Sequence, residues 1–269
     1  MNFSDKVVLV TGASAGIGEA IAILFAEYGA KLALVGRNKD NLTKVAEVCE
    51  KSKGIPPLVI VADLSTDEGV EKTAADTIQH YGRLDVLVNN AGVGARTTIQ
   101  LTDMATFDRV FATNVRGVYN LTRLLVPHLV SSRGNIVNVS SVSGALPNVG
   151  SLPYSMTKAA LDHFSRCIAL ELAPLGVRVN TVSPGFTISE FVKRLTGMSQ
   201  EQYESWLHEA ELGIPLGHAA VGRDIANMVL QLASSLAGSV TGTVVPVDGG
   251  LSLAGTGNST IMTRQIKNQ

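Results

Sequence analysis

A tyrosine and a lysine stand four residues apart in the segment LPYSMTKAALDHF, residues 152–164. Side chains at this spacing lie on the same face of an α-helix. Apolar residues recur at helical spacing downstream, so the sequence predicts a largely buried helix that starts near Tyr154. Tyr154 and Lys158 can therefore address a single point, and a buried phenol and a buried ammonium both need partners.

This pair has two interpretations. In the first, the Tyr154 ring packs in the core, the Lys158 ammonium reaches water, and the spacing has no function. In the second, the pair does proton chemistry, because an ammonium beside a phenol favours the phenolate and lowers a pKa of about 10. The pattern YxxxK is too short to decide by itself, so the choice depends on the rest of the chain.

A glycine-rich turn follows the first predicted strand. The segment TGASAGIG, residues 11–18, places Gly12, Gly16 and Gly18 between a strand and a helix. Glycine lets the backbone approach a phosphate, and the N–H groups at a helix N-terminus bind its charge. The spacing differs from the general pattern G-x-G-x-x-G, and a tight turn without a ligand is the alternative. A strand before and a helix after the turn favour a pyrophosphate site.

The end of the second predicted strand indicates which dinucleotide would bind. An acidic residue near this position usually accepts a hydrogen bond from the ribose 2′-hydroxyl of NAD(H). Here Gly36 is followed by Arg37, whose guanidinium would bind a 2′-phosphate. We therefore expect NADP(H), with a solvated strand-end arginine as the alternative. Asp63, after the third strand, suits the adenine end of the crevice or caps the next helix.

Short apolar runs alternate with helical patterns along the chain. The runs that predict strands are 7–10, 32–35, 58–62, 86–88, 135–140, 177–183 and 243–247. Helical patterns lie near residues 16–28, 39–52 and 67–81, and further helices follow the run 86–88 as far as about residue 131. Another helix begins near residue 154, and a mostly helical stretch follows the run 177–183 as far as about residue 236. Continuous apolar strands between helices are typical of a parallel sheet covered on both faces. We therefore expect one doubly wound, Rossmann-type α/β domain of seven strands over residues 1–255, followed by a polar tail, 256–269.

Composition argues against several other functions. The chain has 22 Lys and Arg against 23 Asp and Glu, with no basic stripe, so we expect no nucleic-acid partner. The uncharged stretch 225–247 has the length of a membrane span, but SSLAGSVTGT within it predicts a turn. Cys49 and Cys167 lack the spacing of a disulfide framework or a metal site, and MNFSDK does not resemble a signal peptide. These features predict a cytoplasmic protein without a metal or a membrane partner.

Seven motifs together resemble the short-chain dehydrogenase/reductase family. Besides TGASAGIG and YSMTK (154–158), they are NNAG (89–92), Asn114 in TNVRG, SS (140–141), PG (184–185) and VDGG (247–250). The resemblance covers almost the whole chain. It implies an oxidoreductase that uses a nicotinamide cofactor to interconvert a ketone and a secondary alcohol.

The resemblance implies an active site of Asn114, Ser141, Tyr154 and Lys158. Tyr154 would give its proton to the carbonyl oxygen as hydride reaches the carbon, while Lys158 would lower the tyrosine pKa and hold the nicotinamide ribose. Ser141, thirteen residues before Tyr154, would donate to the developing alkoxide, with Ser140 as the reserve candidate. Asn114 would anchor a water that relays protons to Lys158.

The resemblance also extends the cofactor site beyond the glycines. Many relatives have Ile or Val two residues after the glycine that matches Gly185 and Thr four after it, where this chain has Thr187 and Ser189. The carboxamide contact therefore falls on Thr187 or Ile188. The predicted cofactor residues are Gly12, Ser14, Gly16, Ile17, Gly18, Arg37, Asp63, Leu64, Asn90, Ala91, Gly92, Pro184, Gly185, Thr187 and Ile188.

The stretch 186–220 is long enough for a lid over the substrate. The residues that predict an apolar pocket are Phe186, Phe191, Leu195, Met198, Tyr203, Trp206 and Leu212, with Val93, Leu146, Pro147 and Val149. We expect a bulky apolar ketone such as an oxosteroid or an ecdysteroid-like 3-ketone, with 3-oxoacyl thioesters as the alternative. Carrier-protein reductases often have a basic residue before the glycine that matches Gly176, where this chain has Leu175. Docking to an acidic carrier is therefore not expected.

The resemblance further implies a homo-oligomer, either a tetramer or a dimer, assembled through the helices near 105–130 and 154–175. Two other functions compete with a reductase. A non-catalytic NADP-binding sensor or scaffold would not need the four active-site residues together. An epimerase or dehydratase often has a longer chain with a substrate lobe, which this sequence lacks.

Overall fold

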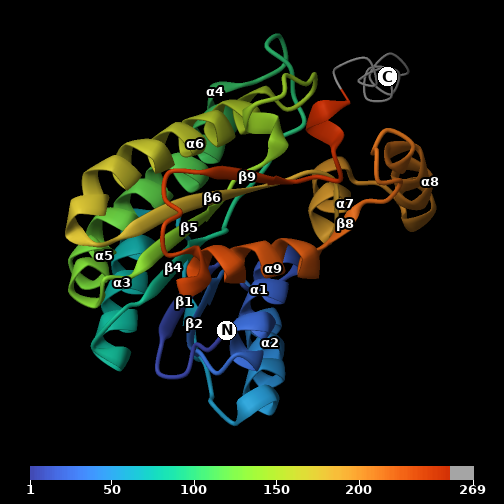
Figure 1. The fold of residues 1–269 in the computed structure, drawn as a ribbon. Helices are drawn as coiled ribbons and strands as arrows, with labels where there is room; N and C mark the ends of the chain where they lie inside the picture. The colour runs from blue at the N-terminus through green and yellow to red at the C-terminus, as the bar shows by residue number, and fades with distance from the viewer. Residues whose placement is uncertain (255–269) are drawn as a thin grey trace.

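The computed structural model describes residues 1–254, with residue 194 described by its backbone only. A seven-stranded parallel sheet in the order β3-β2-β1-β4-β5-β6-β9 forms the centre of the molecule (Figure 1). Its strands are β1 (Val7–Thr11), β2 (Lys31–Gly36), β3 (Leu58–Val61), β4 (Val86–Asn89), β5 (Asn135–Val139), β6 (Arg178–Pro184) and β9 (Val244–Val247). The predicted doubly wound seven-stranded sheet is confirmed.

Helices cover both faces of this sheet. The helices α1 (Gly16–Glu27), α2 (Lys39–Lys53) and α9 (Gly222–Ala233) lie on one face, and α3 (Asp67–Tyr81), α5 (Val118–Ser132) and α6 (Leu152–Leu172) lie on the other (Figure 1). Within β1, Val8 and Val10 belong to the first core and Val7 and Leu9 to the second. Because both faces are buried, the strand reads as a continuous apolar run.

Local signals set the ends of these helices. The Asn38 side chain accepts a hydrogen bond from Asn41 N at the start of α2, and Thr66 caps α3 through Gly69 N. α6 has Pro153 in its first turn, where the missing N–H costs nothing, and it begins two residues before the predicted start. No helix within residues 1–254 combines the length and apolar character that crossing a membrane requires.

Two features of the chain were not predicted. The helix α4 (Met104–Phe111) passes into a π-helical segment, Ala112–Gly117, before α5 begins. The strand β7 (Thr187–Ile188) pairs in parallel with β8 (Ala220–Val221), which joins the two ends of the predicted lid region. Short 3-10 turns also occur at Val142–Gly144, Ala173–Leu175, Ser235–Ala237 and Leu251–Leu253.

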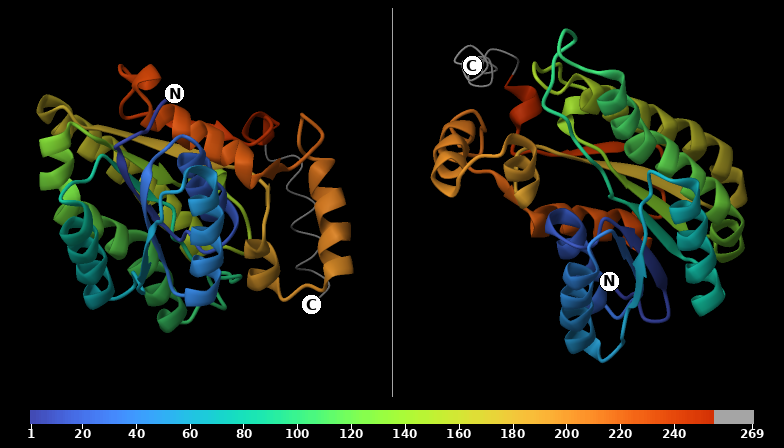
Figure 2. Two further views of the ribbon diagram at one scale, coloured as in Figure 1. Left: turned by 90° about the horizontal axis from the view of Figure 1, so that it is seen from below. Right: turned by 180° about the vertical axis from the view of Figure 1, so that it is seen from behind.

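Between β7 and β8 the chain forms α7 (Glu190–Thr196) and α8 (Gln200–Glu211). Figure 2 shows these helices at the edge of the molecule, apart from the helices that cover the sheet. Tyr203, Trp206 and Ala210 form a small core of their own. The predicted helical character of this stretch is confirmed, whereas the predicted tail, 256–269, lies outside the described residues.

Candidate active site

A cavity of about 400 Å³ lies at the carboxyl ends of the strands, where ligands bind in open parallel sheets. Of the predicted cofactor residues, all but Ile188 line it, as do Ser141, Tyr154 and Lys158. The Ile188 side chain is 42% exposed outside this lining. Asn114 lies behind the lining and is buried. The structure thus brings residues from the first and the second half of the chain to one cavity.

The glycine turn after β1 is shaped for a phosphate. Gly12 has a φ of +67°, and a Cβ at this position would lie 2.9 Å from Asn90 Nδ2. A Cβ at Gly18 would lie 2.2 Å from the Gly12 carbonyl oxygen. The N-cap residue of α1 is Ala15, which provides no side-chain acceptor for the first N–H groups of the helix. Those groups are therefore left for an anion in the cavity, and the turn fits a dinucleotide pyrophosphate.

Arg37 and Asp63 meet at the other end of the cradle. The Arg37 Nη1 atom lies 3.7 Å from Asp63 Oδ2. Burial raises the pKa of Asp63, but hydrogen bonds from Ser65 and the charge of Arg37 outweigh it and hold that pKa below its usual value. Asp63 does not cap the following helix, since Thr66 does so. Arg37 is exposed, and its guanidinium borders the cavity beside the cradle.

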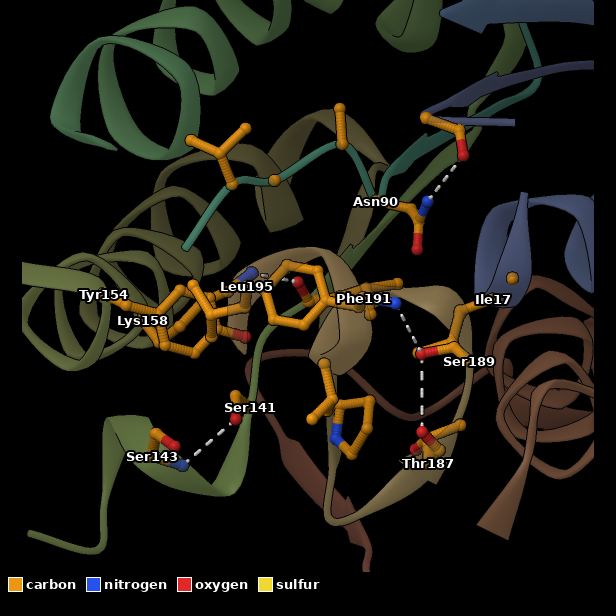
Figure 3. Close-up of a pocket in the computed structure, with 18 of the residues that line it drawn as sticks. Ile17, Asn90, Ser141, Ser143, Tyr154, Lys158, Thr187, Ser189, Phe191 and Leu195 are labelled. Atoms are coloured by element: carbon orange, nitrogen blue, oxygen red, sulfur yellow. Dashed lines mark hydrogen bonds between the residues drawn. The ribbon is translucent and has the colours of Figure 1, made fainter. Parts of the chain in front are cut away.

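Tyr154 and Lys158 lie on one face of α6, and Ser141 faces them from the end of β5 (Figure 3). Ser141 lies close enough to the phenol to act on its pKa, and its hydroxyl accepts a bond from Ser143 N at 3.2 Å. The Lys158 Nζ atom lies 5.5 Å from the centre of the Tyr154 ring and donates to the Val139 carbonyl at 2.9 Å. The serine, the phenol and the ammonium therefore form one cluster at the cavity wall.

The ionisation of this pair differs from the prediction. Burial raises the pKa of Tyr154 to about 12, with the Ser141 hydrogen bond acting against it. Burial lowers the pKa of Lys158 to about 8, and the charge of Asp162 acts against it. The predicted lowering of the tyrosine pKa by Lys158 is wrong for this arrangement, because the ammonium bonds to the Val139 carbonyl and leaves the phenol oxygen to Ser141. The phenol therefore stays protonated at neutral pH, as a proton donor requires.

Ser140 and Asn114 support this cluster: Ser140 lines the cavity beside Ser141, whereas Asn114 lies behind the lining. Ser140 is buried, and its hydroxyl lies 3.3 Å from the Lys158 carbonyl oxygen, so it faces α6 while Ser141 faces the phenol. Asn114 lies in the π-helical segment, a distortion that often occurs at functional sites. Its Oδ1 accepts from Val93 N at 2.8 Å, and its Nδ2 donates to Val93 O and Thr157 Oγ1 at 2.8 and 3.0 Å. Asn114 thus links the loop that follows β4 to α6.

An apolar wall extends from Tyr154 toward α7. The Phe191 ring lies 5.8 Å from the Tyr154 ring, and the Phe186 ring meets Trp206 edge-on at 5.4 Å. The other predicted apolar residues that line the cavity are Val93, Val149, Leu195 and Met198. Four predicted residues do not line it: Leu146, Pro147, Tyr203 and Leu212. Tyr203 stacks on Trp206, which lies on the same helix, α8, and Leu212 is 74% exposed.

The cavity also contains residues that were not predicted. They are Ala15, Val35, Gly36, Arg96, Thr113, Val139, Ser143, Asn148, Gly150, Ser151, Ser189, Val192 and Thr196. Gly36 and Val139 end strands β2 and β5. The rule that ligands lie at the carboxyl ends of parallel strands could have identified them. Arg96 carried no motif, and only its place in the loop after β4 brings it to the cavity.

Known proteins resemble this chain over almost its full length. The family model described as Enoyl-(Acyl carrier protein) reductase matches residues 12–252. A curated relative, the 3-oxoacyl-[acyl-carrier-protein] reductase of Thermotoga maritima, is 36% identical over 253 residues, which cover 93% of this chain and 99% of the relative.

Solved structures of similar proteins contain either nicotinamide cofactor. The L-sorbose reductase of Gluconobacter frateurii, in complex with NADPH and L-sorbose, has a TM-score of 0.88 and 32% identity, with 94% of this chain and 98% of that chain covered. The 3-ketoacyl-(acyl-carrier-protein) reductase of Brucella melitensis, in complex with NADH, has a TM-score of 0.83 and 32% identity, with 93% and 99% covered. With the motifs, the sheet and the cavity described above, these matches show that the chain belongs to the short-chain dehydrogenase/reductase family and is an oxidoreductase of that family.

Proposed function

We propose that this protein is an NADP(H)-dependent reductase that converts the ketone of a 3-oxoacyl thioester to a secondary alcohol. One observation carries this proposal. A single cavity has Ser141, Tyr154 and Lys158 at one end and the glycine turn with Arg37 at the other. A proton donor and a dinucleotide cradle in one cavity are what carbonyl reduction requires.

In the proposed reaction, the chain supplies positioning and proton transfer. The cofactor, when bound, supplies the hydride. Ser141 hydrogen-bonds to the substrate oxygen and stabilises the negative charge that develops there. Tyr154 donates its phenolic proton to that oxygen. Lys158 holds the nicotinamide ribose, and its positive charge balances the phenolate that forms at Tyr154. Asn114 has both amide hydrogens engaged and its Oδ1 already accepts from Val93 N, so a water relay to Lys158 would use the one remaining acceptor position of Oδ1.

NADP(H) is the proposed cofactor because Arg37 borders the cavity and carries a positive charge where a 2′-phosphate would lie. Arg37 Nη1 lies 3.7 Å from Asp63 Oδ2, an ionic contact longer than a hydrogen bond, which leaves the fork of donors available to a phosphate. A similar protein is known with NADPH and another with NADH. The choice between the two cofactors in this chain therefore depends on Arg37.

The thioester is favoured over the oxosteroid by the relatives and by the wall of the cavity. The similar proteins of Thermotoga maritima and Brucella melitensis are 3-oxoacyl and 3-ketoacyl carrier-protein reductases. The apolar wall around Phe191 and Leu195 suits an acyl chain. Arg96, on the same cavity, suits the phosphate groups that a pantetheine-type thioester carries. The aromatic rings of Phe186, Phe191 and Trp206 keep an oxosteroid as the second candidate.

The surroundings of the site support three further parts of the proposal. We propose that residues 186–220 act as a lid, since α7 contributes Phe191 and Leu195 to the cavity. Exposed apolar side chains on α5 and α6, among them Tyr119 and Leu170, favour a homo-oligomer through these helices, and a monomer by light scattering would contradict it. The two cysteines are free, which suits a reducing compartment such as the cytoplasm.

The proposed function is tested by following NADPH oxidation with purified protein. The substrates are 3-oxoacyl-CoA esters, the same acyl groups on acyl carrier protein, a 3-oxosteroid and a neutral 3-oxoester. We expect turnover of the CoA esters and, because Leu175 stands where a basic residue would assist docking, no preference for the carrier-linked form. Preference for the oxosteroid would establish the second candidate. Tight NADPH binding with no turnover on any substrate would favour the sensor or scaffold.

A further inference from the structure

A buried carboxyl group lies one helical turn beyond Lys158. Asp162 follows Lys158 by four residues on α6, and only 6% of it is exposed. Its Oδ1 atom is buried and has no hydrogen-bond partner among the described residues. A buried acid with an unpaired oxygen is costly. The proposed reaction gives Asp162 no role, so its presence in the core needs another reason.

The segment that carries Ser141 packs directly on this carboxyl group. The Ser140 hydroxyl, which donates to the Lys158 carbonyl, lies close enough to Asp162 to act against the effect of burial on its pKa. A Cβ at Gly144 would lie 2.9 Å from Asp162 Oδ2 and 3.0 Å from the Lys158 carbonyl carbon. Only a glycine allows the 3-10 turn Val142–Gly144 to approach α6 this closely. The Asp162 carboxyl group therefore lies under the active-site cluster, where the helix that also holds Lys158 packs against the serine segment.

The charges around Lys158 are few. Among the described residues, Asp162 is the one group whose charge favours the Lys158 ammonium against the cost of burial. Burial raises the pKa of Asp162, and the charges of Arg166 and Lys158 act against that rise and favour the carboxylate. Tyr154 lies one turn before Lys158 on the same helix, and the facing segment contributes Ser140, Ser141 and the Val139 carbonyl, which do not titrate near neutral pH.

We propose that Asp162 is a positioning residue whose buried carboxylate keeps Lys158 in the ammonium form that serves the cofactor and Tyr154. Asp162 acts on Lys158 through its charge, which extends further in a buried environment than in water. Without it, burial alone would act on Lys158, and a neutral amine could no longer balance a phenolate at Tyr154. The inference rests on the proposed function, which makes Lys158 part of the reaction.

The inference is tested by measuring the protonation of Lys158 directly. The full-length protein is labelled briefly with acetic anhydride from pH 6 to pH 10, and acetylation at Lys158 is quantified by peptide mass spectrometry. Only the neutral amine reacts, so the labelling curve follows the pKa of Lys158, which burial lowers to about 8. We expect Asp162→Asn to move the midpoint of this curve down by about one pH unit or more.

Three variants control the measurement. Asp162→Ser also removes the charge, and its hydroxyl can bond to the carbonyl one turn earlier, as Ser165 does to Leu161 at 2.7 Å. It keeps the test available if the asparagine variant does not fold. Asp162→Glu retains the carboxylate and should restore the wild-type midpoint. Glu171→Gln removes one acid from the exposed end of the same helix and should leave the midpoint unchanged.

An unchanged Lys158 midpoint in a folded Asp162→Asn or Asp162→Ser protein would overturn the inference and leave Asp162 a packing residue. An equal shift in Glu171→Gln would overturn it as well, because the effect would then belong to the net charge of the helix. The labelling needs no ketone, so an incorrect substrate assignment leaves its result intact. Loss of turnover with an unchanged midpoint would likewise contradict the role given to Asp162.

Discussion

The two ends of the cavity are built in different ways. At the cofactor end, backbone geometry makes the site: the chain packs so closely at Gly12 and Gly18 that neither position has room for a side chain. At the substrate end, side chains such as Phe191 and Leu195 make it, on helices attached through the two-residue strands β7 and β8. A backbone site tolerates few changes, whereas a side-chain wall can be altered residue by residue. Cofactor binding and substrate choice should therefore respond separately to mutation.

Tyr154→Phe removes the proton donor and leaves the cofactor end and the substrate end of the cavity intact. It should have the largest effect. Removal of a general acid typically lowers turnover by about 10² to 10⁴. The ring remains, so its contact with Phe191 and the shape of the wall are retained. We expect kcat for NADPH-dependent reduction to fall by this factor, while the dissociation constant of NADPH, measured by fluorescence, stays within about twofold. Turnover above a tenth of the wild-type rate would contradict the role of Tyr154 as the proton donor.

Arg37→Asp changes the charge at the cofactor end and should have the next largest effect. Hydrogen bonds to charged groups contribute about 1.5–3 kcal/mol, so the ratio of kcat/KM for NADPH over NADH should fall by about ten- to a hundredfold. The ionic contact with Asp63 is lost as well, and a lower melting temperature reports that part separately. Unchanged cofactor selectivity would refute the assignment of NADP(H) to Arg37.

Gly18→Ala tests whether the cofactor end is a backbone site. The new Cβ would lie 2.2 Å from the Gly12 carbonyl, and an overpacked site of this kind costs about 1–3 kcal/mol. We expect a lower melting temperature and weaker NADPH binding by isothermal calorimetry. Gly54→Ala is the control, because that glycine has a φ of +69° and no atom within 4 Å of the added Cβ. It should lower stability without changing NADPH binding, and equal loss of binding in both variants would contradict the comparison.

Leu195→Ala tests the side-chain wall and should have the smallest effect. Its loss removes apolar surface worth about 1 kcal/mol to a bound acyl chain, so KM for a long-chain 3-oxoacyl-CoA should rise about fivefold. The NADPH KM should not change. Leu212→Ala removes a leucine of the same region that is 74% exposed and outside the cavity. If both leucine variants had the same effect on KM, the wall around Leu195 would not be the acyl site.

The difference between the two ends also explains what the sequence could predict. The strands are apolar runs, and ligands at the ends of parallel strands follow from topology, so the sheet and the lining by Gly12 or Asn90 were predictable. The π-helical segment around Asn114 was not, because one extra residue in a helical turn leaves no periodic signal. Thr187 lines the cavity and Ile188 does not, because the pairing of β7 with β8 sets which side chain faces inward. Each of these strands has only two residues, too few for a strand pattern to be recognised in the sequence.

The ionisation of the active site was the least predictable property. A tyrosine and a lysine on one helical face suggest a lowered tyrosine pKa. The direction reverses because burial acts on both groups and because Lys158 donates to Val139. The pKa of each group depends on everything packed around it, including Asp162, one helical turn after Lys158. Spacing identifies the participants, and packing determines their charges.

The ladder between Thr187–Ile188 and Ala220–Val221 makes the segment between them a cassette. Its two ends are anchored side by side, and the entropy cost of closing a loop grows only slowly with loop length. Such a segment can be exchanged, lengthened or shortened while β6 and α9 remain in place. A new ketone could be accommodated by grafting a different cassette onto the same anchors, with the proton donor and the cofactor cradle inherited unaltered.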